Sequence, residues 1–182
     1  MRRFAVLGNP IEHSKSPEIH RAFAESCRHE IDYQKVLVEA GDFDRVVTEF
    51  FASGGIGLNV TAPFKGEAFA LAEVHTEDAV DAKAVNTLWR DDEGRVCGHT
   101  TDGSGLALDL EVNLGWRLAG ANILFLGAGG AMRSILGPLC DRAPASIHVA
   151  NRTPERAEDL VALFKSRGSL TAGSLTAIPD RA

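Results

Sequence analysis

The chain has 182 residues and a hydrophobic share of 45%, which suits one ordinary domain or two small lobes with a real apolar core. A formal net charge of −6, with no Lys/Arg block and no RNA-type aromatic motif, argues against nucleic acid as a partner. The cysteines Cys27, Cys97 and Cys140 lie far apart, so they indicate neither a disulfide framework nor a metal site, and we expect buried, unreactive thiols.

All apolar segments of the chain are short. Residues 4–7 form an apolar run that is too short for the core of a signal peptide, and no run reaches the ~20 apolar residues of a membrane-spanning helix. We therefore expect a cytoplasmic protein without membrane contact. The sequence leaves monomer and homodimer open as oligomeric states.

The first hundred residues alternate between strand and helix patterns. Short apolar runs predict strands at 4–7, 33–38 and 57–60. Helices are expected from Pro17 onward, over 43–51, over 67–74, and in a shorter piece before Ala84. Residues 86–90 and 95–99 flank a turn and predict a β-hairpin. The helix that starts near Pro17 is expected to bury one face, made of Ile19, Ala22, Phe23 and Cys27.

The strand and helix alternation restarts in the second half. We expect a helix over 102–113, a strand at 122–126, a helix through Leu139, a strand at 147–150 and a helix over 157–164. This order predicts an α/β fold with parallel strands and with ligands at their carboxyl ends. We place an N-terminal α/β lobe at residues 1–101 and a partial Rossmann-type lobe at residues 102–182.

A glycine loop in the second lobe indicates a dinucleotide site. Residues 123–131 read ILFLGAGGA, a strand that runs directly into glycines and then into a helix. Gly127 allows the tight turn, Gly129 lets the backbone approach a pyrophosphate, and the N–H groups at the helix start suit an anion. Met132 stands where the motif has its third glycine, and a glycine-rich turn that binds nothing is the alternative. The expected loop contacts are Gly127, Ala128, Gly129, Gly130 and Ala131.

The end of the next strand favours NADP over NAD. This strand ends in Asn151, Arg152 and Thr153, without the carboxylate that would hold the 2′-hydroxyl of NAD. Arg152 offers a forked guanidinium for a 2′-phosphate, and we count its two neighbours as further cofactor contacts. Alternatively, Arg152 only solvates a helix start at which Thr153 is the N-cap and Pro154 the first helical residue.

A hydride carrier in one lobe implies a small reducible molecule and a proton-transfer group in the other. Residues 59–65 read NVTAPFK, and a lysine such as Lys65 in a partly desolvated cleft can act as a general acid or base. Asp102 is the carboxylate best placed to accompany it. The alternatives are a solvated lysine at a helix start, an ordinary Asp-Gly turn, and strand-edge capping by Asn86 and Thr87.

Six motifs together carry a family resemblance. GNPIEHSKSPEIH, NVTAPFK, AVNT, TDG, LGAGGA and NRT occur in the order and approximate spacing of shikimate dehydrogenases. Between residue 4 and about residue 165, the chain therefore resembles these NADP-dependent oxidoreductases, which reduce 3-dehydroshikimate to shikimate in the biosynthesis of chorismate and aromatic amino acids. The substrate is expected in the cleft between the lobes.

The resemblance also implies roles for individual residues. Ser14 and Ser16 would bind the substrate carboxylate, which suits the favourable field at a helix start, although Ser16 could equally act as N-cap. Lys65 with Asp102 would transfer the proton. The substrate-binding residues expected in this way are Ser14, Ser16, Asn59, Thr61, Asn86 and Asp102.

Three features depart from the family pattern. Thr100 replaces the usual Asn two residues before Asp102, and Lys83 replaces a common glycine, which would cost about 1 kcal/mol if φ is positive there. A whole dinucleotide fold has two βαβαβ halves, and we expect the C-terminal half and the family's returning helix to be absent from these residues. The alternatives to an NADP enzyme are a quinate/shikimate dehydrogenase that uses NAD and a truncated, non-catalytic shikimate- and NADP-binding module.

Overall fold

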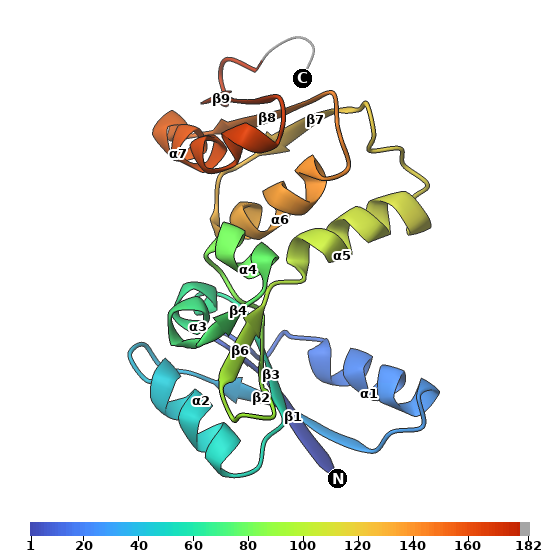
Figure 1. Cartoon of the computed structure of the whole chain (residues 1–182), viewed down its shortest axis with the longest axis vertical. Helices are drawn as coiled ribbons and strands as arrows, with labels where there is room; N and C mark the ends of the chain where they lie inside the picture. Colours follow the sequence, from blue (N-terminus) through green and yellow to red (C-terminus); the bar gives the residue numbers. More distant parts are fainter. Residues whose placement is uncertain (179–182) are drawn as a thin grey trace. The chain divides into compact units, whose positions relative to one another are not determined.

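A computed structural model describes residues 1–178 of the chain and divides it into two compact units (Figure 1). The first unit holds residues 1–79 and 84–100, and the second holds residues 80–83 and the chain from Thr101 onward. In the described part, no helix is both long and apolar enough to cross a membrane.

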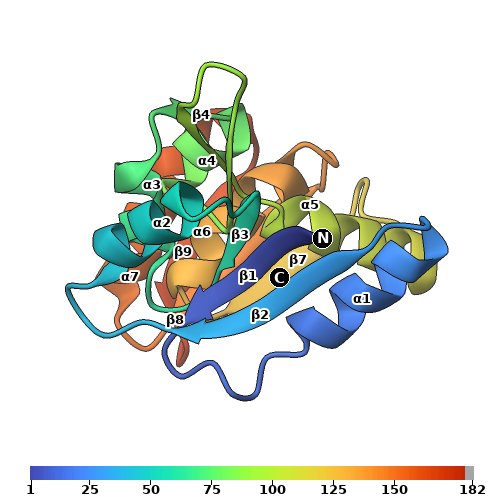
Figure 2. The same ribbon diagram turned by 90° about the horizontal axis from the view of Figure 1, so that it is seen from below.

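The first unit is built on a six-stranded mixed sheet with the order β2-β1-β3-β5-β6-β4. The strands β2 and β3 both pair in parallel with β1, and β5 then pairs antiparallel with β3 and β6. Figure 2 shows β1 and β2 side by side, with α1 next to β2. The strands are β1 (Arg2–Gly8), β2 (Ile31–Leu37), β3 (Gly57–Val60), β4 (Val74–His75), β5 (Thr87–Arg90) and β6 (Val96–His99).

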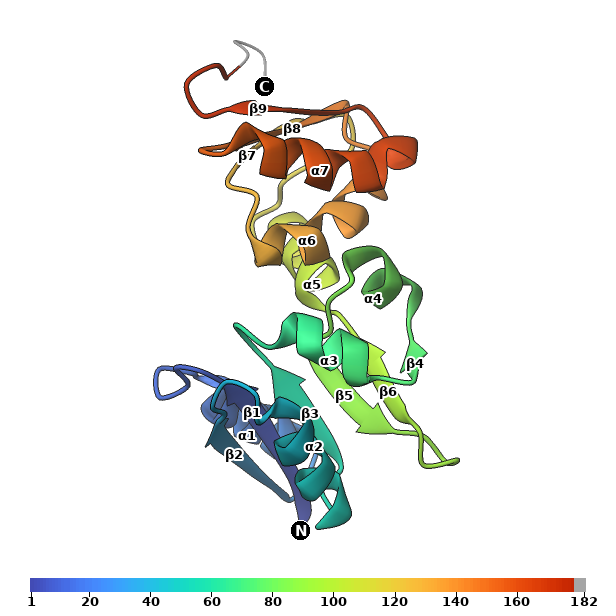
Figure 3. The ribbon, with the colours of Figure 1, turned by 90° about the vertical axis from the view of Figure 1, so that its left-hand side faces the viewer.

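Helices cover both faces of this sheet. Residues Ser16–Ser26 form α1 on one face, while α2 (Phe43–Ala52) and α3 (Lys65–Leu71) lie on the other (Figures 1 and 3). The main core lies under α2 and α3, where the rings of Phe43 and Phe64 stack with centroids 5.4 Å apart. A short helix, α4 (Glu77–Ala82), follows β4.

The second unit contains a three-stranded parallel sheet with the order β7-β8-β9. Its buried residues come mainly from β8, α6 and α7, with Ala107 and Leu118 added from the segment before β7. Figure 3 shows α6 and α7 on the same side of the sheet. The arrangement β7-α6-β8-α7-β9 makes one βαβαβ half of a Rossmann-type fold. The elements are α5 (Asp102–Leu108) with a π-helical turn (Asp109–Asn113), β7 (Asn122–Leu126), α6 (Gly130–Cys140), β8 (Ser146–Asn151), α7 (Pro154–Phe164) with a 3-10 turn (Lys165–Arg167), and β9 (Leu170–Ser174).

The α/β class expected from the sequence is confirmed, with two errors in the elements. The helix expected over 67–74 ends at Leu71, because the Glu73 N–H donates to the Val96 carbonyl at 2.8 Å and Val74 pairs with Cys97 in the sheet. The strand β9 was not predicted, because its sequence LTAGS has only two apolar residues in alternation, Leu170 and Ala172. Parallel pairing with β8 creates it.

The expectations for α1 and for one cysteine are also wrong. Ile19 is 48% exposed and Phe23 61% exposed, Ala22 and Cys27 are exposed as well, and the buried residues of α1 are Pro17 and Ala24. Phe23 and Cys27 border an apolar cavity, described below, together with Phe4 and Ile31 of the sheet, so they stay exposed instead of packing on the strands. Cys97 and Cys140 are buried as expected.

Candidate functional site

The two serines at the start of α1 lie together. The helix begins at Ser16 with Lys15 as its N-cap, so the expectation that Ser16 is the cap is wrong by one residue. Ser14 Oγ donates to Ser16 Oγ at 3.2 Å and accepts from the Ser16 N–H at 3.3 Å. Both side chains are half-buried at a helix N-terminus, where the unpaired N–H groups favour an anion.

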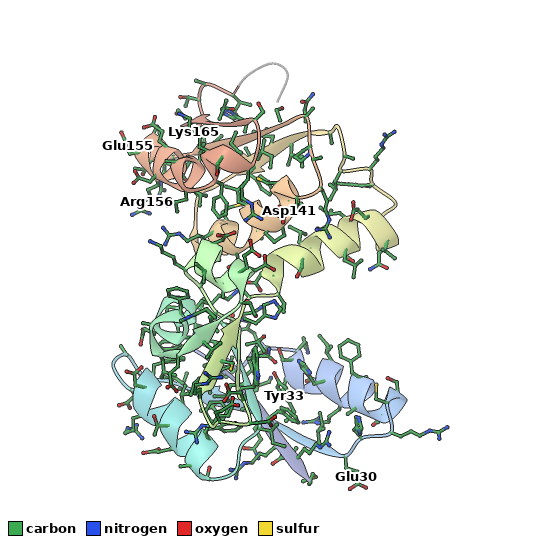
Figure 4. All side chains as sticks on the ribbon, in the orientation of Figure 1. Glu30, Tyr33, Asp141, Glu155, Arg156 and Lys165 are labelled. Atoms are coloured by element: carbon green, nitrogen blue, oxygen red, sulfur yellow. The ribbon has the colours of Figure 1, made fainter. Side chains whose placement is uncertain are left out.

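A buried tyrosine connects these serines to the sheet. Figure 4 labels Tyr33, which lies on β2 and is 3% exposed. It forms a hydrogen bond with Ser16 and donates its hydroxyl to Asn59 Oδ1 at 2.5 Å. Burial is the main cause that raises the pKa of Tyr33 well above its usual value, and the bond to Ser16 opposes it. The phenol therefore keeps its proton at physiological pH and remains a donor.

The same network continues into β5. The Asn59 amide donates to the Thr87 hydroxyl at 3.3 Å and to the Asn86 carbonyl at 3.4 Å, and Thr87 Oγ1 donates to Asn86 Oδ1 at 2.9 Å. The antiparallel register of β3 and β5 sets these contacts, because Asn59 lies directly opposite Thr87. We call the connected set the polar network. It consists of Ser14, Ser16, Tyr33, Asn59, Asn86 and Thr87.

Two further predicted residues follow β3 at the same end of the sheet. The Thr61 N–H donates to the Leu7 carbonyl at 2.9 Å, and a Cβ atom added at Gly8 would lie 2.5 Å from the Thr61 methyl group. This glycine therefore allows the close approach of the two strand ends. Lys65 is the half-buried first residue of α3, and its carbonyl accepts from the Val85 N–H at 2.9 Å.

Asp102 belongs to the second unit, where it is the first residue of α5. The next residue fixes the start of this helix, because a Cβ atom added at Gly103 would lie 2.3 Å from the Ser134 carbonyl oxygen of α6. Lys65 and Asp102 thus come from different units, and their pairing stays a prediction. Among the described residues, the buried hydroxyl of Thr100, one of the departures from the family pattern, has no hydrogen-bond partner.

The glycine loop of the second unit has the geometry of a dinucleotide site. Gly127 has φ +118°, a conformation that side chains rarely adopt, and its N–H donates to the Ala150 carbonyl at 2.7 Å. At Gly129 and Gly130 an added Cβ atom would meet no described heavy atom within 4 Å. The protein's own packing therefore does not require these two glycines, and the loop backbone before α6 is open to a ligand. Ala131 is exposed in the first turn of that helix.

Asn151 braces this loop. Its Oδ1 accepts from the Ala128 N–H at 3.2 Å, and its amide donates to the Thr153 carbonyl at 2.8 Å. The side chain thus joins the glycine loop to the loop after β8. Arg152 is exposed, and Thr153 is the N-cap of α7 with Pro154 as the first helical residue, as the sequence predicts.

Sequence reasoning missed two arginines beside the loop. A cavity of about 230 Å³ is bordered by the loop backbone at 128–130 and by the side chains of Arg133, Arg156 and Asp159. Figure 4 labels Arg156 on α7. Two guanidinium groups next to open N–H donors fit the phosphates of a dinucleotide. The sequence could have indicated them by their positions, because Arg133 and Arg156 lie in the first turns of α6 and α7, the helices that follow β7 and β8.

The polar network also contains residues that sequence reasoning missed. Tyr33 was assigned only to a strand, and its hydroxyl contacts became visible only when α1 and β3 were placed. His20, which stacks on Tyr33, lies one helical turn after Ser16, and this i, i+4 spacing was the available signal. Among residues 1–178, no group of three or more His, Cys, Asp or Glu side chains could hold a metal ion.

Two protein-family models match this chain. The family model for the shikimate dehydrogenase substrate binding domain matches residues 6–88, and the shikimate / quinate 5-dehydrogenase model matches residues 110–180. The chain belongs to the shikimate dehydrogenase family. The first matched segment falls in the first unit except for residues 80–83, and the second segment falls in the second unit.

Individual relatives and solved structures are similar over almost the whole chain. A shikimate dehydrogenase (NADP(+)) of Alkalilimnicola ehrlichii is 51% identical over 93% of this chain and 63% of its own length. A crystal structure of the Ael1 enzyme from Pseudomonas putida has a TM-score of 0.89 at 39% identity, covering 95% of this chain and 64% of that one. The shikimate 5-dehydrogenase of Thermus thermophilus in complex with NADP(H) and shikimate has a TM-score of 0.84 at 35% identity, covering 93% and 62%.

The present sequence is shorter than these family members. It spans 63% to 66% of the length of three curated relatives. The described fold accordingly contains one βαβαβ half in its second unit.

Proposed function

We propose that the protein reduces 3-dehydroshikimate to shikimate with NADPH. The observation that carries this proposal is the polar network, because it joins Ser14, Ser16, Asn59 and Asn86 through hydrogen bonds although they lie far apart in the sequence. A hydroxylated ring acid needs such a set, with hydroxyl donors for its carboxylate and amides for its alcohols. The two serines of the network lie at the start of α1, where the helix dipole favours the negative charge of the substrate carboxylate.

The proposed binding roles follow from the chemistry of each side chain. Ser14 and Ser16 turn their hydroxyls to the carboxylate, and the N-terminus of α1 supports the same charge. Thr61, Asn86 and Asp102 hold the ring hydroxyls. Asn59 contacts the substrate beside them, with its carbonyl kept in place by Tyr33.

The proposed proton transfer uses Lys65. NADPH, when bound, supplies the hydride to the carbonyl carbon of the substrate. The Lys65 ammonium gives a proton to the carbonyl oxygen, and the neutral amine takes that proton back in the reverse direction. Asp102 accepts from a substrate hydroxyl and keeps the lysine oriented.

The second unit provides the cofactor contacts in this proposal. The loop residues Gly127, Ala128, Gly129, Gly130 and Ala131 present backbone to the pyrophosphate. Arg152 and Arg156 face the 2′-phosphate, and Asn151 and Thr153 shape the loop around it. No carboxylate follows β8 directly, so NADP is preferred over NAD.

We further propose that residues 1–101 act as the substrate-binding domain and residues 102–182 as part of the cofactor domain. The protein works in the cytoplasm, as a monomer or a homodimer, on a small-molecule substrate and without nucleic acid or membrane. These statements rest on the family membership and on the composition of the chain.

Lys65→Ala tests the proton-transfer role. We expect kcat for shikimate oxidation to fall at least 100-fold, because general acid–base catalysis contributes about 10²–10⁴-fold, while the KM for shikimate changes little. The measurement is the initial rate of NADP reduction. Lys35→Ala is the matched control, since the Lys35 ammonium donates to the Glu12 carbonyl and has no proposed role. Unchanged turnover in Lys65→Ala would remove the assignment.

The binding-module alternative requires a separate measurement. Calorimetric titration with shikimate and with NADP, next to a turnover assay, separates the possibilities. Binding of both ligands with turnover supports the dehydrogenase, whereas binding without turnover identifies a non-catalytic module. Turnover rates with NAD and with quinate test the remaining alternative. Higher rates with NAD than with NADP, together with turnover of quinate, would support a quinate/shikimate dehydrogenase.

A further inference from the structure

His20 makes two specific contacts with the polar network. It lies on α1 one turn after Ser16, and its ring stacks on the Tyr33 ring with centroids 4.4 Å apart and an interplanar angle of 10°. Its side chain also forms a hydrogen bond with Asn59. The imidazole therefore touches two neighbouring members of the network at once, one with its face and one with its edge.

The direction of the hydrogen bond follows from the other partners of the Asn59 amide. Its NH₂ group already donates to the Thr87 hydroxyl and to the Asn86 carbonyl, so the imidazole N–H is the donor and Asn59 Oδ1 the acceptor. The same oxygen accepts from the Tyr33 hydroxyl. Burial, the larger cause, lowers the pKa of His20, and the bond to Asn59 opposes it.

Two donors on one oxygen determine how the Asn59 amide is turned. The two ends of an asparagine amide are similar in shape, and only the surrounding donors and acceptors decide which end faces which way. With Oδ1 held by His20 and Tyr33, the NH₂ group must face Thr87 and Asn86, where it donates. The reversed amide would bring two N–H donors against each other.

The side chains around Tyr33 and Asn59 have no close packing neighbours on one side. A cavity of about 480 Å³ with mostly apolar walls borders His20, Tyr33, Asn59 and Thr87. Side chains on the wall of an open cavity have room to change rotamer, because they lack close neighbours on that side. The stacking and the hydrogen bond from His20 supply the missing constraint.

We propose that His20 is a positioning residue of the substrate site. It holds the Tyr33 ring and the side-chain carbonyl of Asn59, so that the hydroxyls of Ser14 and Ser16 and the side chain of Asn86 meet the substrate in one fixed arrangement. This inference rests on the proposed function for the identity of the substrate. It does not assign His20 a contact with that substrate, since its donor nitrogen is used by Asn59.

Two substitutions separate the contacts of His20. His20→Phe keeps a stacking ring but removes the hydrogen bond, and His20→Ala removes both. We expect the Kd and the KM for shikimate to rise about 5-fold in His20→Phe and about 10-fold or more in His20→Ala, while kcat and the Kd for NADP stay within 2-fold. A residue that only stabilises the fold would lower the unfolding midpoint without this selective effect on shikimate. His29→Ala is the matched control, because His29 lines the same cavity and no hydrogen bond of its side chain is seen among the described residues.

A double-substitution cycle tests whether His20 acts through its two partners. In a Tyr33→Phe, Asn59→Ala background, His20→Phe should change the Kd for shikimate less than 2-fold, because the groups that it holds have been removed. An equally large effect in both backgrounds would overturn the proposal.

A measurement on the free protein keeps the inference independent of the substrate. The side-chain amide resonances of ¹⁵N-labelled Asn59 should shift and broaden in His20→Phe and remain unchanged in His29→Ala. If the wild-type chain binds shikimate but His20→Phe alters neither the Kd nor these resonances, the positioning role is wrong. If the wild-type chain binds no shikimate, the proposed function fails, and the resonances then decide for or against the positioning of Asn59 by His20.

Discussion

The polar network of the first unit and the glycine loop of the second are built from different groups. The network consists of buried and half-buried side chains that hydrogen-bond to one another, and the strand end beside it is so crowded that Gly8 cannot carry a Cβ atom without moving Thr61. The loop consists of backbone N–H groups in open space with exposed or half-buried arginines around it. A small, neutral-to-acidic ring is recognised by fixed directions, whereas phosphates are recognised by charge and by accessible backbone.

Two glycine substitutions should break this contrast in opposite ways. Gly8→Ala should lower the free energy of unfolding by about 1–3 kcal/mol, because the new methyl group displaces the Thr61 side chain, and it should weaken shikimate binding. Gly129→Ala should leave stability nearly unchanged and weaken NADP binding, because its methyl group points into open space that the cofactor needs. Urea unfolding and ligand titration check both. Equal stability of the two variants would show that the sites do not differ in packing.

Replacement of one arginine beside the glycine loop should separate the binding of NADP from that of NAD. Arg152→Gln should weaken NADP binding about tenfold and leave NAD binding unchanged, since only NADP carries the 2′-phosphate. The loss should shrink at high salt, because an exposed arginine is screened. Arg117→Gln is the control, an exposed arginine of the same unit away from the loop. A parallel loss of NAD affinity would argue that Arg152 acts on the loop rather than on the phosphate.

The half-buried imidazole of His20 should make the stability of the first unit depend on pH. Because burial lowers the pKa of His20, the unfolded chain binds a proton at higher pH than the folded one, so this contribution to stability is present above about pH 6.5 and is lost as the pH falls. The slope is at most about 1.4 kcal/mol per pH unit. Other charged or titratable groups nearby are Arg2 and His29, which border the same cavity, and Lys35 on β2. A His20→Gln variant keeps all three, so it isolates the contribution of His20. Between pH 7.5 and pH 5.5, the urea midpoint should therefore fall more in the wild type than in this variant. The same fall in both would exclude His20 as the cause.

The smallest effect is expected where the chain departs from its family. Lys83 has φ +46°, the strained conformation that its replacement of a glycine predicts. Lys83→Gly should raise the free energy of unfolding by about 1 kcal/mol or less, because relief of the strain is partly offset by the greater freedom of glycine in the unfolded chain. Urea unfolding measures this change. A loss of stability would mean that the lysine side chain makes a contact that outweighs the strain.

Local signals in the sequence were enough for most elements and for the glycine loop. The run ILFLGAGGA specifies a strand, a turn that needs φ > 0 at Gly127, and a helix start, and all three depend on neighbours in the sequence. Thr153 and Pro154 likewise define the start of α7 locally. The strand β9 could not be predicted in this way, because its pairing with β8 rather than its own sequence makes it a strand.

The polar network shows why the candidate site was only partly predictable. The family motifs pointed to Ser14, Ser16, Asn59 and Asn86, but not to the groups that join them. Tyr33 and His20 acquire their roles through contacts between α1, β2 and β3, which no local pattern encodes. The exposure of Phe23 and Cys27 on α1 was not predictable for the same reason, since these residues border a cavity and do not pack on the sheet.

The division of labour between the two units is the central claim, and separate calorimetric titrations of shikimate and NADP into the Asn59→Ala and Arg152→Gln variants test it most directly. We predict that Asn59→Ala weakens shikimate binding at least tenfold with NADP binding within twofold of the wild type, and that Arg152→Gln does the reverse. Unimpaired shikimate binding by Asn59→Ala, or loss of both ligands in either variant, would contradict the account.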